Sequence, residues 1–214
     1  MALDAPPKPL VAPYGHLDRE AVQCVANAAH YYEVPELLLH AILQKENGRV
    51  GQEVRNRNGS YDLGLAQINT VWLEHFAKYG VTREQLRDDR CTNLYAMGYV
   101  LRTNVNRYGG DDWFRAVIAY NIGPNGWKQN PGRYRIGYQY AVDVISKWHD
   151  MHGRVFGKAS TATTAIASDE AGRRRAAREN IATAGGRVLN FSASHAEWRP
   201  PLYKSSPYNK GNDY

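Results

Sequence analysis

Helical signals follow one another with little interruption between Asp18 and His149, and this succession most constrains what the chain can fold into. Asp18 can cap a helix that runs to about Tyr32. Pro35 suits the first turn of a second helix, which covers residues 36–46 and ends before Gly48. The same patterning predicts further helices over residues 70–79, 82–86, 92–108, 111–120 and 134–149. The sequence therefore predicts a mostly α-helical domain.

One segment between these helices lacks the helical pattern. Residues 56–60 are polar and contain Gly59, which is typical of a turn. Residues 61–69 are short and partly apolar, which favours a small strand or an ordered loop over a helix. We therefore expect a small strand-and-loop lobe over residues 56–69 beside the helices.

The two ends of the chain differ in composition from the part between them. Residues 1–14 include four prolines, which favour an extended N-terminal arm. Residues 158–214 contain a low-complexity stretch and the basic run Arg173-Arg174-Arg175, which predict a C-terminal tail. Residues 15–157 form the predicted domain.

Composition and charge exclude several classes of protein. An apolar content of 43% against 22% charged residues indicates a globular core rather than disorder. The mean hydropathy is -0.59, and no run of about 20 apolar residues provides a membrane-spanning segment. The net charge of +6 divides into +2 through Gly157 and +4 beyond it. Because phosphate binding needs clustered Lys and Arg, the near-neutral domain argues against a nucleic-acid partner.

The two cysteines, Cys24 and Cys91, stand in no metal-like spacing. Such a pair is compatible with one long-range disulfide in an oxidising compartment, or with two buried thiols. Residues 1–7 have neither the basic region nor the apolar region of a secretory signal peptide. Export would therefore require a signal that is missing from this sequence, or another route.

Glu46 occupies an unusual place for a carboxylate. Leu39, Ile42, Leu43 and Glu46 are spaced at i, i+3, i+4 and i+7, so Glu46 ends an otherwise apolar helix stripe. A carboxyl group held against apolar neighbours loses hydration, which raises its pKa and keeps it protonated near neutral pH. Such a group can serve as a catalytic acid. The alternative is an exposed carboxylate at a frayed helix end.

Three motifs occur in order along the chain: Glu46-Asn47-Gly48, Gly64-Leu65-Ala66-Gln67-Ile68-Asn69 and Ala119-Tyr120-Asn121-Ile122-Gly123-Pro124. They resemble the ordered motifs of the soluble lytic transglycosylase (SLT) domain, and the resemblance covers about residues 19–149. It implies a lysozyme-like fold in which Glu46 faces the cleft between the helices and the small lobe. Asn47 stands where that family usually has Ser, and Ala66 where it usually has Met.

A narrower resemblance concerns Cys24, residues 58–62 and Cys91-Thr92-Asn93. These are similar to the small specialised SLT proteins that accompany type IV secretion, conjugation, type III secretion and pilus machines. Members of that subgroup are exported to the periplasm, which implies a periplasmic location and fits a Cys24–Cys91 disulfide. The resemblance also implies machinery partners, and we expect residues 158–214 to recruit the domain to them.

The resemblance assigns roles to individual residues. Glu46 would be the catalytic acid and then the base, with Tyr120 hydrogen-bonded near its carboxyl group. The side chains expected to bind the saccharide are Asn47, Gln67, Asn69, Tyr120 and Asn121. Glu46 would protonate the β-1,4 glycosidic oxygen between N-acetylmuramic acid and N-acetylglucosamine, and the muramic acid 6-hydroxyl would attack C1. The implied product is a 1,6-anhydromuramic acid end.

Two other functions stay open. A hydrolytic muramidase, similar to goose-type lysozyme, would use Asp62 as a second carboxylate, whereas Asp62 is otherwise a turn residue bonded to its own backbone. A peptidoglycan-binding scaffold of a secretion machine would bind glycan without cleaving it. The sequence contains no cofactor motif, and His149 and His152 lack a third metal ligand, so we assign neither cofactor nor metal. We expect a monomer whose partner is the peptidoglycan strand.

Overall fold

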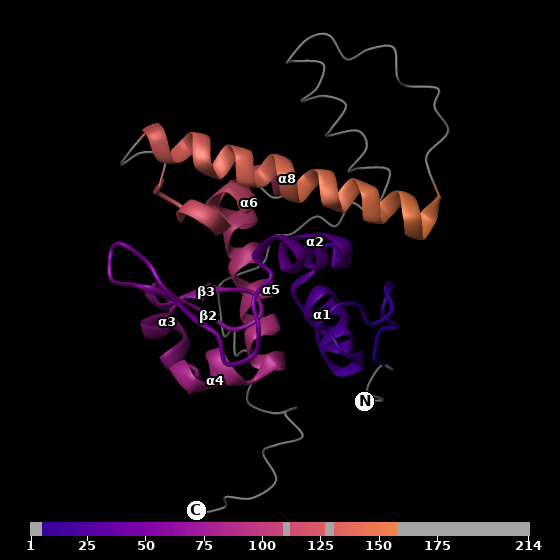
Figure 1. The fold of residues 1–214 in the computed structure, drawn as a ribbon, viewed down its shortest axis with the longest axis horizontal. Helices are drawn as coiled ribbons and strands as arrows, with labels where there is room; N and C mark the ends of the chain where they lie inside the picture. The colour runs from indigo at the N-terminus through magenta and orange to yellow at the C-terminus, as the bar shows by residue number, and fades with distance from the viewer. Residues whose placement is uncertain (1–5, 109–111, 127–130, 158–214) are drawn as a thin grey trace, which may run out of the picture.

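The computed structural model describes residues 6–108, 112–126 and 131–157. Its elements follow in the order α1 (Arg19–Tyr32), α2 (Glu36–Glu46), β1 (Glu53–Arg55), β2 (Tyr61–Leu63), β3 (Ile68–Asn69), the 3-10 helix η1 (Thr70–Trp72), α3 (Leu73–Ala77), α4 (Arg83–Asp88), α5 (Arg90–Arg107), α6 (Trp113–Ile122) and α8 (Pro131–Phe156). The predicted fold class, mostly helical with a small β lobe, is confirmed (Figure 1). The predicted tail over residues 158–214 lies outside the described residues.

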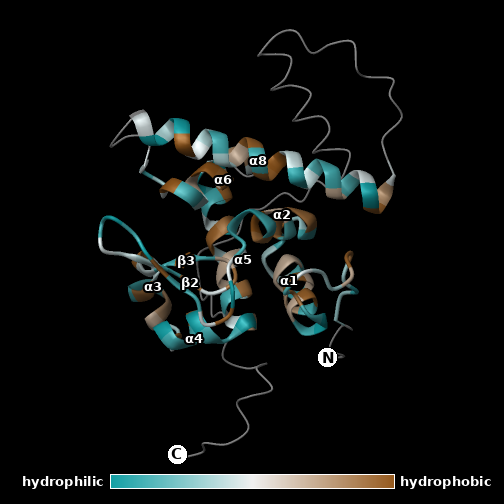
Figure 2. Cartoon of the chain, in the orientation of Figure 1, coloured by the Kyte–Doolittle hydropathy of each residue, from teal (hydrophilic) through white to brown (hydrophobic). Residues whose placement is uncertain are grey.

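Helix α5 is the central element of the domain, and α1 and α6 pack against it. Its apolar residues at spacings of three and four, Leu94, Met97, Leu101 and Val105, are all fully buried. Helix α8 lies across α6 and α2 (Figure 1). Figure 2 shows apolar and polar residues alternating along α8, as expected for a helix with one buried face. No helix within the described ranges is long and apolar enough to cross a membrane.

The sheet is antiparallel, with strand order β1-β2-β3. Glu53 pairs with Leu63, and Asp62 pairs with Asn69. The lobe begins at Glu53, earlier than the predicted Asn56. All three side chains of β1 are exposed, so this strand has no apolar alternation that predicts it.

Local capping explains where several helices begin. The Asp18 carboxylate accepts a hydrogen bond from the Ala21 N–H at 2.9 Å, as predicted for the start of α1. Residues 70–79 do not form the single predicted helix, because the Asn69 side chain caps a separate 3-10 turn before α3. Helix α8 extends beyond the predicted 134–149 at both ends.

The described part of the N-terminal arm, residues 6–14, is attached to the first two helices. The Leu10 N–H donates to Glu36 Oε1 at 2.6 Å, and Gln23 Nε2 donates to the Pro7 carbonyl at 2.8 Å. A hydrogen bond of 2.9 Å joins the Tyr14 hydroxyl to Nδ1 of the buried His40. The arm therefore packs against α2, the helix that ends at Glu46.

Cys24 of α1 and Cys91 of α5 are joined by a disulfide. The two residues are separated by 67 positions, and the intervening chain includes α2, the whole sheet and α4. The loop that the bond closes therefore contains both of the first two motifs.

We expect the double variant Cys24→Ala/Cys91→Ala to lose about 4 kcal/mol of unfolding free energy, because opening a loop of 67 residues restores entropy to the unfolded chain. Urea unfolding of the variant, and of the wild-type protein with and without dithiothreitol, measures this loss. Identical unfolding midpoints in all three samples would contradict the prediction.

Candidate active site

Glu46 is the last residue of α2 and is part-buried. Its stripe neighbours Leu39, Ile42 and Leu43 are at most 2% exposed. The helix ends at this point because Asn47 adopts the left-handed conformation, with φ of 51°, and its N–H bonds to the Leu43 carbonyl. The carboxyl group therefore stands against the core, not at an exposed frayed end.

Burial raises the pKa of Glu46 from 4.5 to about 7, because the charged carboxylate loses hydration. The hydrogen bond from Tyr140 opposes this rise, the negative charge of Asp62 adds to it, and the positive charge of Lys45 opposes it. A carboxyl group with a pKa near 7 is substantially protonated at neutral pH, which suits a general acid.

The direct partner of the Glu46 carboxyl is Tyr140 of α8, whose hydroxyl donates a hydrogen bond to Glu46 Oε1. Tyr140 is 7% exposed. It lies within the buried stripe of α8 that also contains Gly137, Ala141, Val144 and Trp148. Sequence reasoning missed Tyr140, although a hydroxyl inside an apolar stripe is the same kind of signal that identified Glu46.

Tyr120 does not make the hydrogen bond expected of it near the Glu46 carboxyl. Its hydroxyl donates instead to the Ala66 carbonyl at 2.7 Å. The pKa of Tyr120 is raised well above its usual value, by burial first and then by the charges of Glu46 and Asp62. Tyr120 therefore lies close to both carboxyl groups, but its polar atom holds the second motif in place.

The first and second motifs meet through their backbones at Gly48. A Cβ at Gly48 would lie 2.3 Å from the Gly64 carbonyl oxygen and 2.6 Å from that of Leu65, so no other residue fits without displacing the loop. Gln67 adopts a left-handed φ of 51°, and its Nε2 donates to the Gly64 carbonyl at 2.8 Å. The loop of residues 64–67 is therefore tightly folded against the end of α2.

Asn93 of α5 holds this loop from the opposite side. Its Nδ2 donates to the carbonyls of Leu63 and Leu86 at 2.8 and 2.6 Å, and its Oδ1 accepts from the Ala66 N–H at 2.7 Å. Asn93 is 1% exposed. Ala66 is itself fully buried, so its replacement of the family's usual Met alters a core contact.

Asp62 lies on strand β2 and is not the turn residue considered above. Its Oδ1 accepts a hydrogen bond of 2.6 Å from Asn69 Nδ2. The Asn69 amide also donates to Ser60 Oγ at 3.0 Å and accepts from the Val71 N–H at 3.0 Å. The Asn69 side chain thus holds Asp62 and starts η1, and its binding of a saccharide stays a prediction.

The remaining predicted binding residues differ in their exposure. Asn47 and Asn121 are exposed, and Gln67 is intermediate. Asn47 Oδ1 accepts a hydrogen bond of 3.3 Å from Arg49 Nη1. In the part of the chain that is described, no three His, Cys, Asp or Glu side chains gather as metal ligands.

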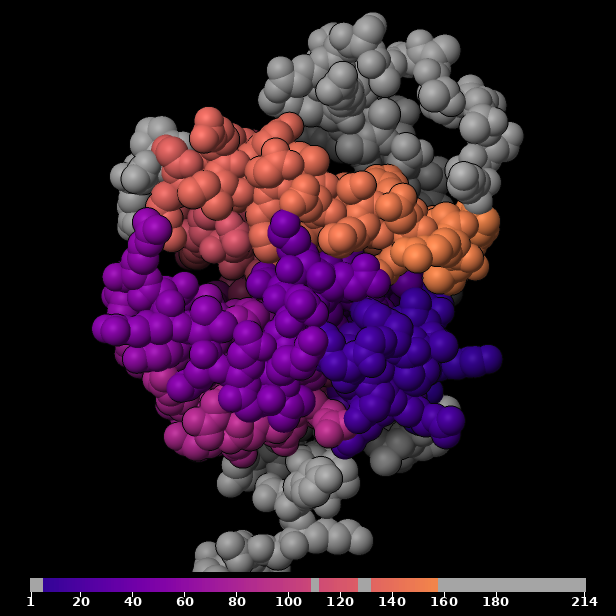
Figure 3. Space-filling model, in the orientation of Figure 1, coloured from indigo at the N-terminus to yellow at the C-terminus, as the bar shows by residue number. Residues whose placement is uncertain are grey.

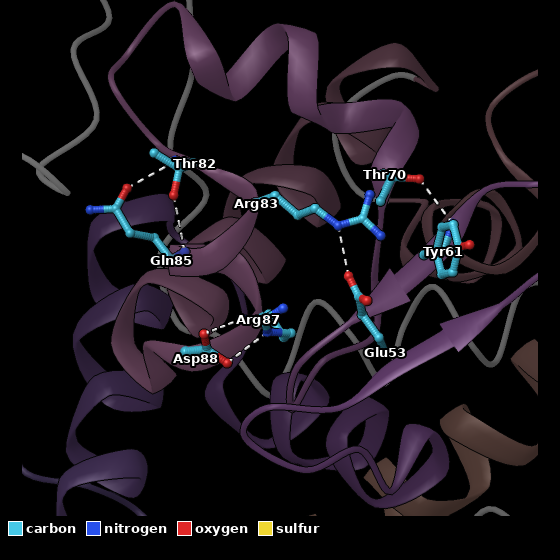
Figure 4. Close-up of polar contacts among 8 residues, drawn as sticks. All are labelled: Glu53, Tyr61, Thr70, Thr82, Arg83, Gln85, Arg87 and Asp88. Atoms are coloured by element: carbon cyan, nitrogen blue, oxygen red, sulfur yellow. Dashed lines mark hydrogen bonds and ion pairs between the residues drawn. The ribbon is translucent and has the colours of Figure 1, made fainter.

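The β lobe is fastened to α4 through Arg83 (Figure 4). Arg83 Nε donates to Glu53 Oε1 at 2.7 Å, and its guanidinium lies 4.6 Å from the centroid of the Tyr61 ring. The Tyr61 N–H donates to Thr70 Oγ1 at 2.9 Å. These contacts fix β1 and β2, and with them the backbone that carries Asp62.

A groove of about 440 Å³ lies beside Tyr140. It is lined by Lys45 of α2, Asn121 of α6 and α8 residues that include Tyr140 and Asp143. Figure 3 shows the surface hollowed between the purple strand region and the salmon N-terminal half of α8, whereas the residues that line the groove come from α2, α6 and α8 and none from the strands. Tyr140 connects this groove with the carboxyl of raised pKa, because it lines the groove and its hydroxyl bonds to Glu46, which is not itself a lining residue.

Comparison with known families identifies the class of protein to which this chain belongs. The transglycosylase SLT domain matches residues 23–139, which is more than half of the chain. The chain therefore belongs to the transglycosylase SLT family, as the three motifs predicted.

Several individual proteins are similar to the chain. Invasion protein IagB of Salmonella typhimurium (strain SL1344) is 31% identical over 131 residues, 61% of this chain and 78% of that protein. Protein IpgF of Shigella flexneri is 31% identical over 134 residues, 62% of this chain and 82% of that protein. The X polypeptide of Escherichia coli is 32% identical over 130 residues, 60% of this chain and 75% of that protein.

We expect Asn93→Ala to lower the free energy of unfolding by about 3 kcal/mol, because it leaves buried backbone groups of the second-motif loop unpaired. Asn106→Ala, at an exposed position of the same helix, is the matched control and should change stability by less than about 0.5 kcal/mol. Urea unfolding compares the two variants, and equal effects would contradict the role assigned to Asn93.

We expect Glu46→Gln to be more stable than the wild type above pH 7, by roughly 2–3 kcal/mol. Between 4.5 and about 7 the unfolded chain ionises at Glu46 while the folded protein stays protonated, so ionisation opposes folding. Below about pH 4 both states are protonated and the difference disappears. Urea unfolding at acidic and alkaline pH tests this, and a difference independent of pH would refute it.

Proposed function

We propose that the protein is a peptidoglycan lytic transglycosylase that cleaves the β-1,4 bond between N-acetylmuramic acid and N-acetylglucosamine. The observation that carries the proposal is the Glu46 carboxyl, which is part-buried, is bonded to a residue that lines an open groove, and has its pKa raised to about 7. Membership of the transglycosylase SLT family supports the same reaction.

Tyr140 determines which oxygen of Glu46 carries the proton. Burial raises the pKa of Tyr140 well above its usual value, so its hydroxyl stays neutral and acts as the donor to Glu46 Oε1. Oε1 is therefore the acceptor oxygen, and the acidic proton of the neutral carboxyl belongs on Oε2. Within the described ranges, Oε2 makes no hydrogen bond and remains available to the glycosidic oxygen.

The proposed reaction needs one carboxyl group and no water. Glu46 Oε2 gives its proton to the glycosidic oxygen, and the bond from that oxygen to C1 of the muramic acid breaks. The muramic acid 6-hydroxyl oxygen bonds to C1, and its proton passes to the Glu46 carboxylate, which restores the acid. Such proton transfer contributes about 10²- to 10⁴-fold to a rate, and alignment of the 6-hydroxyl contributes further.

Asp62 supports a second candidate, a hydrolytic muramidase. Its charge acts on Glu46, and the Asn69 amide holds its carboxylate in place. In a hydrolase, such a second carboxylate activates a water molecule or attacks the sugar. In a transglycosylase, Asp62 takes no part in bond formation, and its negative charge only helps to keep Glu46 protonated.

The two candidates differ by one water in their products. We expect mass spectrometry of muropeptides released from purified peptidoglycan to show ends about 18 Da lighter than a reducing sugar, and Glu46→Gln to lose at least about 100-fold in rate. Because the Asp62 charge raises the pKa of Glu46, Asp62→Asn should yield the same product while moving the alkaline limb of the pH profile to lower pH.

If the products carry reducing ends and their release is lost in Asp62→Asn, the protein is a hydrolase and the proposal is wrong. If the protein binds peptidoglycan and releases no product, it is a peptidoglycan-binding scaffold and the proposal is wrong. Rates that do not fall above about pH 7 would contradict the role of Glu46 as the acid.

We further propose that the protein acts in the periplasm and opens the cell wall locally for a secretion, conjugation or pilus apparatus. One of the similar proteins is called an invasion protein, and that name supports the part of the proposal that concerns an apparatus by analogy alone. The disulfide between Cys24 and Cys91 supports an oxidising compartment. Residues 158–214 are the segment that we assign to recruitment by the apparatus.

A further inference from the structure

The groove beside Tyr140 extends away from the reacting carboxyl along the N-terminal half of α8. Besides Lys45, Asn121 and Tyr140, its walls include Arg135, Ile136 and Gln139. Tyr140 belongs to both regions, because its side chain lines the groove while its hydroxyl bonds to Glu46. A ligand bound at Glu46 therefore has this groove directly next to it.

Among the described residues, no ion pair compensates one of the positive charges that line the groove. Lys45 Nζ is paired with Asp143 Oδ2 at 2.6 Å, and Gln139 Nε2 donates to Asp143 Oδ1 at 3.3 Å. Arg135 lines the same groove, and it makes no ion pair or hydrogen bond with any described residue. The net charge of the groove therefore comes from the guanidinium of Arg135.

A guanidinium of this kind is suited to a carboxylate ligand. It presents its donors in a planar fork that matches the two carboxylate oxygens. Ile136, which is 62% exposed, adds an apolar wall next to it, and the Asn121 amide adds a donor and an acceptor. Together these groups match a peptide that has both aliphatic and acidic side chains, better than they match a neutral sugar.

We propose that this groove binds the acidic peptide stem of the muramic acid, with Arg135 pairing to a stem carboxylate. The inference rests on the proposed function, because that function places a muramic acid at Glu46. The stem branches from the lactyl group of this sugar, so it leaves the glycan next to the bond that is cleaved. The groove is then a specificity site, and peptide-bearing glycan is the preferred substrate class.

The test compares two substrates with matched variants. Purified peptidoglycan, and the same material with its stems removed by an amidase, are digested by the wild type, Arg135→Gln and Arg133→Gln at subsaturating substrate. We expect the wild type to cleave the peptide-bearing material about three- to tenfold faster, the range for one partly exposed charged hydrogen bond. Arg135→Gln should bring this ratio of rates close to one.

Arg133 is the control, because it is exposed on the same helix and does not line the groove. Arg133→Gln should keep the wild-type ratio. A wild-type ratio of one, an unaltered ratio in Arg135→Gln, or equal losses in both variants would overturn the assignment of the groove while leaving glycan cleavage intact. Failure of the wild type to cleave either material would instead overturn the proposed function.

Discussion

The close approach of two backbone segments at Gly48 is the constraint on which the site depends. The end of α2 and the loop of residues 64–67 can meet there only because Gly48 has no side chain. On the far side, Asn93 and Tyr120 bond to the same loop, from α5 and α6. The surroundings of Glu46 are thus set by a close main-chain approach at Gly48 and by side-chain hydrogen bonds from Asn93 and Tyr120 to the loop backbone.

Helix α8 contributes as much to the site as the segments that carry the motifs. Tyr140 partly offsets the cost of burying Glu46, and its neighbours on the same helix form the adjoining groove. The domain keeps a carboxyl group in a place where its ionisation weakens the fold, which is common at sites that perform chemistry. The negative charge of Asp62, in the β lobe, raises the pKa of Glu46 further. Residues of both the helices and the β lobe therefore influence the protonation of Glu46.

Local sequence signals predicted much of the fold. Contacts between residues that are distant in the sequence could not be predicted from such signals. The bounds of α1 and α2 follow from Asp18, Pro35 and Gly48, whose effects act within a single turn of the chain. Strand β1 has only exposed side chains, so no apolar pattern marks it. The apolar stripe of α2 indicated Glu46 as a buried carboxyl, but no local feature connects it with Tyr140, 94 residues later.

Helix α8 is 26 residues long, and Tyr140 lies in its first half. From Tyr140 to Phe156 the helix rises about 24 Å, at about 1.5 Å per residue. The chain beyond Gly157 is therefore joined to the domain at the far end of α8 from Tyr140 and its partner Glu46. Under the proposed recruitment through residues 158–214, this helix would be a spacer between the attachment point and the groove.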